Sequence, residues 1–187
     1  MEELLILVDQ HDRKKGFAPK LQAHQQGLLH RAFSIFIFDQ AGRLLLQQRA
    51  FGKYHSQGLW TNTCCGHPRP GERTMAAAKR RLQEEMGMTC PLRKVSTLLY
   101  REQVSNQLIE YEFDHLFVGI SHCDPVANPE EAHAWQWLQL SQISERIDAA
   151  PERFTIWFRR ILQTTGPAGI SAWTELTETS RQAVPYS

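Results

Sequence analysis

One stretch of the chain places carboxylates beside arginines in a way that suits a metal-bound phosphate. Residues 80–85 read Arg-Arg-Leu-Gln-Glu-Glu, so Glu84 and Glu85 follow two arginines closely. Hard carboxylate oxygens are the ligands that Mg²⁺ bound to a diphosphate prefers. The ordinary alternative is an exposed helix whose arginines and glutamates pair at a spacing of four residues, each pair worth about 0.2–0.5 kcal/mol. The residues at fixed spacings around this segment decide between a metal–phosphate site and an exposed charged helix.

A second segment combines cysteine with histidine. Residues 58–68 read Gly-Leu-Trp-Thr-Asn-Thr-Cys-Cys-Gly-His-Pro, which puts Cys65 two positions before His67. This spacing could supply half of a zinc site, but the chain has no second Cys-x-x-Cys or matching pair to complete it. A single cysteine is usually a buried structural residue. The segment therefore needs further context before Cys65 or its neighbour Cys64 is given a chemical role.

Histidines and glutamates that could bind a metal ion are scattered along the chain. Glu110 and Glu112 flank Tyr111 in a predicted strand, so the two carboxylates lie on one face and the tyrosine on the other. Any one of the eight histidines is more often a surface or core residue than a ligand. We keep that ordinary interpretation for five of them: His11, His55, His115, His122 and His133.

The segment from Gly66 to Met88 resembles the Nudix box, G-x5-E-x7-R-E-U-x-E-E-x-G-U with U aliphatic. Every fixed position matches except one, where Arg81 replaces the first glutamate of the run. Replacing a carboxylate with a cation weakens a metal-holding cluster and creates a charge suited to phosphate oxygens. The box therefore indicates a site that holds a diphosphate rather than one that cuts it.

The run Thr-Asn-Thr-Cys-Cys-Gly-His-Pro at residues 61–68 resembles the active-site signature of type 1 isopentenyl-diphosphate isomerases, an offshoot of the Nudix fold. The resemblance covers roughly residues 4–162 and accounts for Arg81. It implies that Cys65 is catalytic and that Cys64 is its non-catalytic neighbour. Gln57 stands where the family usually has proline, which should loosen that turn without touching the chemistry.

The resemblance also implies two cations. In this family a divalent metal is bound by three histidines and two glutamates, here His24, His30, His67, Glu110 and Glu112. By donor preference this set suits Mn²⁺, Zn²⁺ or Fe²⁺ better than Mg²⁺, which stays a candidate. The other cation is Mg²⁺, which arrives with the substrate diphosphate and is held by Glu85.

The same resemblance implies a reaction that interconverts isopentenyl and dimethylallyl diphosphate by adding a proton at one carbon and removing one from another. Glu112, assisted by Tyr100, and Cys65 as a thiolate favoured by the His67–metal unit would carry the two transfers from opposite faces. Because an alkene is a weak base, its protonation builds a tertiary carbocation, to which Trp157 would offer a π face. The positions that grip the diphosphate are Lys20, Arg49, Lys53 and Arg81.

Two other functions fit parts of the sequence. A Nudix hydrolase of a nucleoside diphosphate derivative would share the fold and the need for Mg²⁺, and it would tolerate loss of Cys65. Arg81 argues against it. A non-catalytic metal-binding module would retain metal without turnover, but structural zinc sites use paired ligands at short spacing, unlike these scattered histidines.

A predicted α+β fold must position these residues: a Nudix-like mixed, largely antiparallel sheet sandwiched by helices, with additional N- and C-terminal elements. Strands are predicted at residues 4–9, 30–39, 43–49, 95–101, 108–120 and 130–140, and helices at 74–86, 141–147 and 151–163. The strand at 30–39 is apolar on both faces, which predicts a central position. Residues 1–187 are predicted to form one domain, with 164–187 a loosely packed tail.

Composition limits the partners. The 21 Lys and Arg nearly balance the 20 Asp and Glu, so no bulk positive field exists to hold a nucleic acid. The longest purely apolar run, Leu4–Val8, is too short for membrane insertion, and the acidic start does not suit a signal peptide. Four cysteines do not suggest a disulfide framework. We expect a cytoplasmic monomer or homodimer that binds a small allylic or homoallylic diphosphate.

Overall fold

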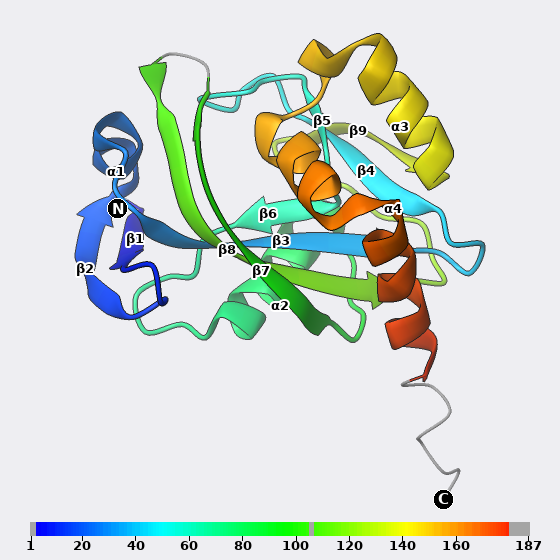
Figure 1. Cartoon of the computed structure of the whole chain (residues 1–187), viewed down its shortest axis with the longest axis horizontal. Coiled ribbons are helices and arrows are strands. Elements are labelled where there is room, and N and C mark those ends of the chain that lie inside the picture. The colour runs from blue at the N-terminus through cyan, green and yellow to red at the C-terminus, as the bar shows by residue number, and fades with distance from the viewer. Residues whose placement is uncertain (1–2, 105–106, 180–187) are drawn as a thin grey trace, which may run out of the picture.

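The structure is a computed structural model that describes residues 3–104 and 107–179. Within these ranges nine strands form one mixed sheet, and helices cover both of its faces (Figure 1). This arrangement confirms the predicted α+β fold. No helix in the described ranges combines the length and the apolar character needed to cross a membrane.

The N-terminal part contains two elements that the sequence did not predict. Strand β1 (Leu4–Val8), which was predicted, pairs with β2 (Lys14–Pro19), and helix α1 (Lys20–Gln26) follows directly. Strand β2 begins with two lysines and α1 has seven residues, so neither carries a clear apolar period. Their stability comes from pairing with β1 and from tertiary contacts, which a local pattern does not reveal.

Strand β3 (His30–Phe38) is the centre of the sheet, as predicted. It pairs in parallel with β8 (Ile109–Ile120) and antiparallel with β6 (Cys64–Gly66). The remaining strands are β4 (Leu44–Arg49), β5 (Trp60–Thr61), β7 (Arg93–Gln103), which pairs with β8, and β9 (Ala132–Leu138), which pairs with β4. Burial on both faces explains why β3 is apolar almost throughout.

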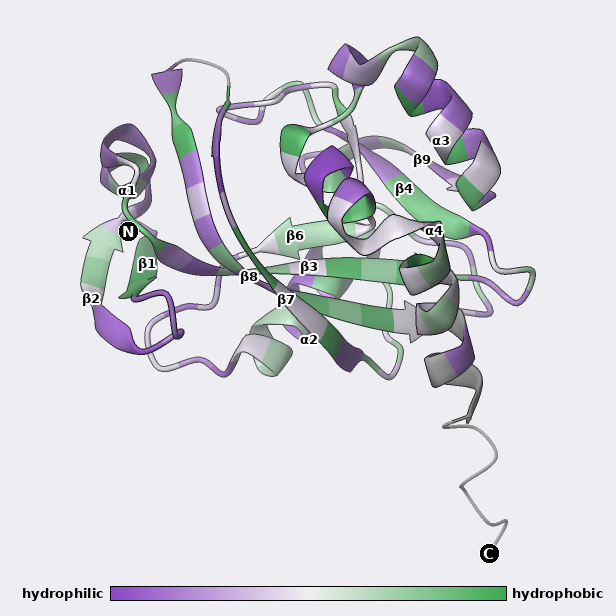
Figure 2. Ribbon diagram, viewed as in Figure 1, coloured by the Kyte–Doolittle hydropathy of each residue, from purple (hydrophilic) through white to green (hydrophobic). Residues whose placement is uncertain are grey.

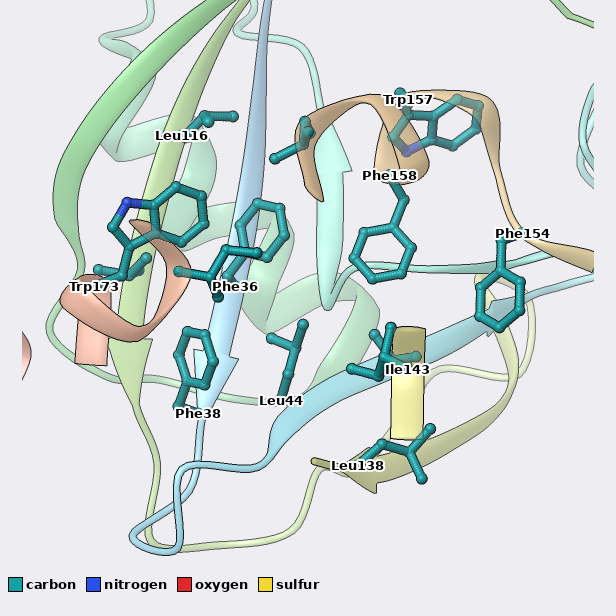
Figure 3. Packing of buried hydrophobic residues seen from close by; sticks show 14 of the residues in the cluster. Phe36, Phe38, Leu44, Leu116, Leu138, Ile143, Phe154, Trp157, Phe158 and Trp173 are labelled. Atoms are coloured by element: carbon teal, nitrogen blue, oxygen red, sulfur yellow. The ribbon is translucent and has the colours of Figure 1, made fainter. Parts of the chain in front are cut away.

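Alternate side chains of β3 enter two separate cores. Phe33, Ile35 and Ile37 pack against α2 (Thr74–Met86), whose bounds were predicted and which ends at Gly87 in the left-handed conformation. Phe36 and Phe38 point the other way, into a core formed with α3 (Leu140–Ala149) and α4 (Ile156–Thr179) (Figure 3). The sheet is therefore clamped between α2 and the C-terminal helices.

The C-terminal part differs from the prediction. Pro151 begins a short 3-10 turn (Pro151–Arg153) rather than the last helix, and α4 continues past a break at Gly166, where φ is 70°. Loose packing from residue 164 does not describe this region, because Ile170 and Trp173 are buried on the core. Their spacing of three residues places both on one face of the helix. The expected tail at 180–187 lies outside the described residues.

The sheet face beneath α4 is divided along its length. Figure 2 shows hydrophilic residues in the first part of β3 and β8 and hydrophobic residues toward their ends. Since the two strands are parallel, their polar parts lie side by side. The polar part, at the start of both strands, contains three predicted site residues: His30, Glu110 and Glu112.

Candidate active site

Strand register assembles the polar part of this face. His30 of β3 pairs with Glu112 of β8, and Glu112 pairs with Tyr100 of β7. Because paired residues in adjacent strands point to the same side, these three side chains form a row. Glu110, two positions before Glu112, shares that side. The Tyr100 hydroxyl donates to Glu112 Oε2 at 2.6 Å and lies 3.2 Å from Glu110 Oε2.

The two adjacent cysteines point to opposite sides of the sheet. Cys65 of β6 pairs with Ser34 of β3, which lies on the same side as His30. Cys64 is fully buried in the core beneath α2. The structure thus places Cys65 beside the polar row and Cys64 among core residues, and the catalytic role of Cys65 stays a prediction.

Four predicted metal ligands converge from four parts of the chain: His24 of α1, His30 of β3, His67 after β6 and Glu112 of β8. One potential ligand atom from each lies within 4.8 Å of the others. Glu112 Oε1 lies 3.0 Å from His67 Nε2 and 3.5 Å from His30 Nε2. The fifth predicted ligand, Glu110, is adjacent, with Oε1 3.9 Å from His24 Nε2.

The polar atoms of this cluster fit a divalent cation. Nε2 of His24, Nε2 of His30 and Nδ1 of His67 are buried and have no hydrogen-bond partner among the described residues. Buried polar atoms normally have partners, so the two bare Nε2 atoms of His24 and His30 that face one cluster indicate a missing ligand. His67 faces the cluster with Nε2, 3.0 Å from Glu112 Oε1, while its Nδ1 lies 3.9 Å from Glu3 Oε1. The other nitrogen of His30 lies 2.8 Å from the Leu28 carbonyl oxygen, which leaves Nε2 as the lone-pair nitrogen. Imidazole and carboxylate donors together suit a transition metal.

The protonation states of His24, His67 and Glu112 agree with this assignment. Burial lowers the pKa of His24 to about 3, and burial also lowers the pKa of His67 well below its ordinary value. For His30, burial acts downward, but the hydrogen bond and charge of Glu112 outweigh it and raise the pKa. Burial alone would raise the pKa of Glu112, yet its contacts with His30 lower it. Two imidazoles are thus neutral and the carboxylate is ionised, the forms that bind metal.

A single cavity of about 720 Å³ brings the predicted residues together. His24 and His30 are fully buried and are not among its lining residues. The cavity is large enough for a small-molecule substrate. Its wall includes the other eleven predicted residues: Lys20, Arg49, Lys53, Cys65, His67, Arg81, Glu85, Tyr100, Glu110, Glu112 and Trp157.

Helix α2 brings Arg81 and Glu85 to this cavity as a pair. Arg81 donates to Glu85 Oε1 at 2.6 Å and to Glu84 Oε2 at 2.7 Å. Gln47 donates to the other oxygen of Glu85 at 2.9 Å. These contacts hold the predicted diphosphate-binding arginine beside the predicted Mg²⁺ ligand. The neighbouring Arg80 instead forms ion pairs with Glu84 and with the Glu72 of the box motif.

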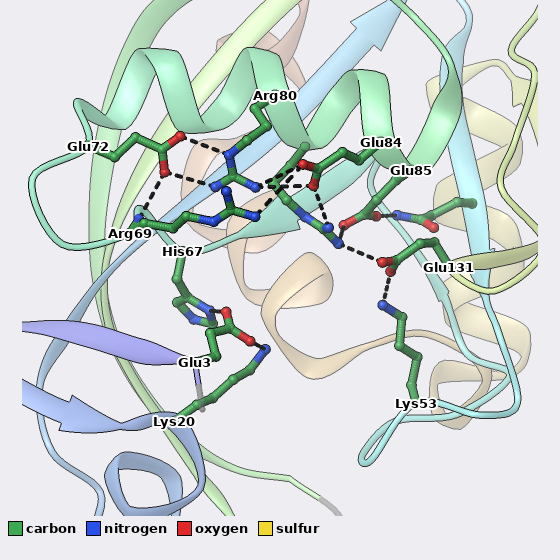
Figure 4. Close-up of polar contacts among 12 residues, drawn as sticks. Glu3, Lys20, Lys53, His67, Arg69, Glu72, Arg80, Glu84, Glu85 and Glu131 are labelled. Atoms are coloured by element: carbon green, nitrogen blue, oxygen red, sulfur yellow. Dashed lines mark hydrogen bonds and ion pairs between the residues drawn. The ribbon is translucent and has the colours of Figure 1, made fainter. Parts of the chain in front are cut away.

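The other predicted diphosphate-binding cations also have partners. Lys20 Nζ lies 2.8 Å from Glu3 Oε2, and Lys53 is ion-paired with Glu131 (Figure 4). Arg49 lies over the Trp157 ring, with its guanidinium carbon 5.2 Å from the ring centroid. The cations of the cavity are therefore oriented before any substrate binds.

The Cys65 thiol differs from the expected thiolate. Removal from water raises the pKa of Cys65, and Glu85, Glu112 and Glu110 act in the same direction. Arg49 is the opposing charge. In the metal-free chain Cys65 is therefore a neutral thiol that has a proton to give.

Sequence reasoning missed four lining residues whose side chains contact predicted site residues: Glu3, Tyr54, His55 and Glu131. His55, interpreted as an ordinary histidine, is 4% exposed and its Nε2 lies 3.1 Å from Glu110 Oε1. The sequence signal that could have identified His55 is its position two residues after Lys53, a predicted diphosphate-binding residue. The two glutamates carry no local signal, because their partners are remote in the sequence.

Comparisons with known proteins give a family match and relatives of high identity. Residues 28–158 match the family model described as NUDIX domain. A Serratia proteamaculans protein named isopentenyl-diphosphate Delta-isomerase is 56% identical, covering 94% of this chain and 98% of the relative. A Burkholderia multivorans protein of the same name is 52% identical, covering 92% and 98%.

Solved structures show the same fold. A Deinococcus radiodurans protein superimposes with a TM-score of 0.65 at 20% identity, covering 79% of this chain and 90% of that one. A MutT protein from Methanosarcina mazei gives a TM-score of 0.60 at 18% identity, covering 73% and 91%. At such identities the likeness concerns the fold alone.

Proposed function

The chain belongs to the isopentenyl-diphosphate Delta-isomerases within the NUDIX family, and from this premise we infer that it interconverts isopentenyl and dimethylallyl diphosphate. It is an isomerase that moves a carbon–carbon double bond, a step of isoprenoid biosynthesis. The observation that carries the inference is more than 50% identity to isomerases of that name over nearly the whole chain. This favours the isomerase over a Nudix hydrolase, in agreement with Arg81 in the box.

Cation binding is proposed at two places. The residues that would hold a divalent metal, Mn²⁺, Zn²⁺ or Mg²⁺, are His24, His30, His67, Glu110 and Glu112. Glu85 would contact the Mg²⁺ that accompanies the diphosphate. A bound divalent cation supplies positive charge that orients Glu112 and lowers its proton affinity.

Two groups on either side of β3 are proposed to move the protons. Glu112 and Tyr100 lie on strands to one side of it, and Cys65 lies on β6 to the other. An alkene held between them can receive a proton from one group while a neighbouring carbon loses one to the other. The hydroxyl of Tyr100, 2.6 Å from Glu112 Oε2, would hold the carboxyl group in place during the transfer.

The intermediate of such a reaction is a tertiary carbocation, which needs a dry and electron-rich surrounding. Trp157 is 3% exposed and lines the cavity. Its ring already has the Arg49 guanidinium over it, which shows that positive charge is accommodated there. An aromatic face stabilises a desolvated cation by about 2 kcal/mol.

The diphosphate is proposed to bind Lys20, Arg49, Lys53 and Arg81, which surround the same cavity. Arg81 provides a planar fork of donors that matches phosphate oxygens, whereas the lysines act as point charges. These groups would hold the substrate at its charged end, so that the alkene lies between Cys65 and Glu112.

Incubation with isopentenyl diphosphate and Mg²⁺ in D₂O, followed by NMR, tests the proposal. The expected result is deuterium in the carbon skeleton as dimethylallyl diphosphate appears, with the diphosphate intact. Glu112→Gln should be silent, and Glu130→Gln, which changes an exposed glutamate, should react normally. Release of phosphate, or cleavage of nucleoside diphosphate derivatives without isomerisation, would contradict the isomerase and favour the hydrolase.

A further inference from the structure

The loop after β4 carries three adjacent residues that contact different parts of the site. Lys53 is ion-paired with Glu131 on the diphosphate side. The hydroxyl oxygen of Tyr54 lies 2.5 Å from His24 Nδ1. His55 Nε2 lies 3.1 Å from Glu110 Oε1. Two neighbouring side chains thus contact two different residues of the metal-ligand set.

We propose that Tyr54 and His55 are positioning residues that hold His24 and Glu110 in the orientation that receives the metal ion. The inference rests on the metal ligands assigned under the proposed function and adds the second layer of contacts around them. Such outer contacts fix the tautomer and direction of metal-binding side chains, and their loss typically lowers metal affinity 10- to 100-fold.

Tyr54 acts on the tautomer of His24. An imidazole binds metal through the nitrogen that has no hydrogen, and Nε2 of His24 is the buried nitrogen that faces the cluster. The hydrogen therefore belongs on Nδ1, where the Tyr54 hydroxyl oxygen accepts it. His30 has the same arrangement, with the Leu28 carbonyl oxygen 2.8 Å from its Nδ1. A side-chain hydroxyl thus does for His24 what the main chain does for His30.

His55 acts on the carboxylate of Glu110. His55 Nε2 lies within ion-pair distance of Glu110 Oε1, at 3.1 Å, whereas Glu110 Oε2 only shares, at 3.2 Å, the Tyr100 hydroxyl that donates to Glu112 at 2.6 Å. Oε1 also lies 3.9 Å from His24 Nε2, so the oxygen that His55 orients is the one nearest the metal-binding nitrogens. This carboxylate is 5% exposed, so its orientation depends mainly on the side chains around it.

The His55 ring is itself well fixed. Its Nδ1 lies 3.2 Å from Ser56 Oγ, and Arg49 donates to its main-chain oxygen at 3.2 Å. The ring packs edge-on against Trp157, with centroids 5.8 Å apart, and against Tyr54, at 4.5 Å. A rigid ring loses little entropy when it orients a partner, which suits a positioning role.

A positioning role is favoured over direct ligation by the geometry. Among the described residues, the group whose ligand atoms all lie within 4.8 Å of one another contains His24, His30, His67 and Glu112. Neither Glu110 nor His55 belongs to it, and Glu110 lies between His55 and the group, with Oε1 3.9 Å from His24 Nε2 and 3.1 Å from His55 Nε2. His55 instead contacts the far side of the ligand set through Glu110. We therefore place it one contact away from the cation.

The test is the dissociation constant of Mn²⁺, measured by chelator competition on the full chain without substrate. Tyr54→Phe removes only the hydroxyl and should weaken binding about 10- to 100-fold. His55→Leu should weaken it similarly, whereas His55→Gln keeps an N–H donor and should restore most of the affinity. His133→Gln, at an exposed histidine, is the matched control and should bind as the wild type does.

Urea unfolding of each metal-free variant separates positioning from a general structural role. The proposal requires Tyr54→Phe to lose affinity with an unfolding midpoint close to that of the wild type. Wild-type affinity in both Tyr54→Phe and His55→Leu would overturn it, as would absence of Mn²⁺ binding by the wild type. X-ray absorption of the Zn²⁺-loaded chain should count the same number of imidazole ligands in the wild type and in His55→Gln. One imidazole fewer in the variant would make His55 a metal ligand and refute the positioning role.

Because no substrate is present, these results are independent of the D₂O experiment. A chain that binds Mn²⁺ through positioned ligands but fails to isomerise would refute the proposed function and leave this inference standing.

Discussion

The two ends of one sheet face use the same strands for opposite purposes. At the start of β3 and β8, His30 and Glu112 pair across the strands, and imidazole nitrogens are buried without partners. At the other end, Phe38 and Val118 are fully buried in an aromatic and aliphatic core under α4. Unpartnered buried polar atoms destabilise a fold, and a well-packed core supplies the compensating stability. The comparison shows that one sheet face can carry the candidate active site at its polar end and a stabilising hydrophobic core at its apolar end.

The largest difference is expected from two adjacent cysteines. Cys65→Ala removes the proposed proton-transfer group from the polar side and should lower kcat by about 10²- to 10⁴-fold, with the fold intact. Cys64→Ala is the same change on the α2 side and should lower the free energy of unfolding by about 1 kcal/mol, with kcat retained. Steady-state kinetics and urea unfolding measure both. Greater loss of kcat in Cys64→Ala than in Cys65→Ala would reverse the assignment.

The apolar end is tested by Phe38→Ala. Its side chain is fully buried, so its truncation should lower the free energy of unfolding by about 3–5 kcal/mol while folded molecules keep their kcat and metal affinity. Phe51→Ala is the control, since Phe51 is 63% exposed and should change stability little. Equal effects of the two changes in chemical denaturation would show that the core under α4 is not the source of stability.

Trp157 belongs to both ends, because it packs in the core beneath α4 and also lines the cavity. Trp157→Leu should lose the interaction with the carbocation, worth about 2 kcal/mol or about 30-fold in kcat. Trp157→Phe keeps an aromatic face and should recover part of it. Both variants lose packing, so unfolding measurements are needed beside the kinetics. Equal kcat in the Leu and Phe variants would leave no role for the π face.

The smallest effect is the pH dependence of stability, which the polar end should dominate in the metal-free chain. The folded-state pKa values of His24 and His67 are lowered by burial, so unfolding takes up protons below pH 6.5, the ordinary histidine value. Stability should then fall as the pH drops below 6.5, by at most about 1.4 kcal/mol per pH unit for each group. His30 has the opposite effect on stability. Because its pKa is raised in the folded state, its protonation stabilises the fold fully below pH 6.5, and this stabilisation is lost as the pH rises through the folded-state pKa.

The urea midpoint of the metal-free chain should therefore be highest near pH 6.5 and decline on both sides. Saturating Mn²⁺ should shift the whole profile, because metal binds the deprotonated imidazoles. A profile that is flat from pH 5 to 8 would contradict the protonation states given to the three histidines.

The sequence could predict the elements with strong periodicity and the types of site residue. The bounds of α2 and the central place of β3 followed from apolar spacing, and the two motifs pointed to the cysteines and Arg81. The pairing of His30 with Glu112 could not be predicted from the sequence, because strand register joins positions far apart in the chain. The same holds for the carboxylates that partner Lys20 and Lys53, and for His55.

The paired cations of the cavity have a consequence for selectivity. Lys20 with Glu3, Lys53 with Glu131 and Arg81 with Glu85 form a surface that is nearly neutral until something divides the pairs. An anion entering alone gains lysine and arginine contacts but strands three carboxylates. An anion that brings its own divalent cation supplies positive charge to the carboxylate nearest that cation, Glu85, while it contacts Arg81 and the lysines. We therefore expect the cavity to bind the proposed diphosphate more tightly together with its Mg²⁺ than as a bare anion of the same shape.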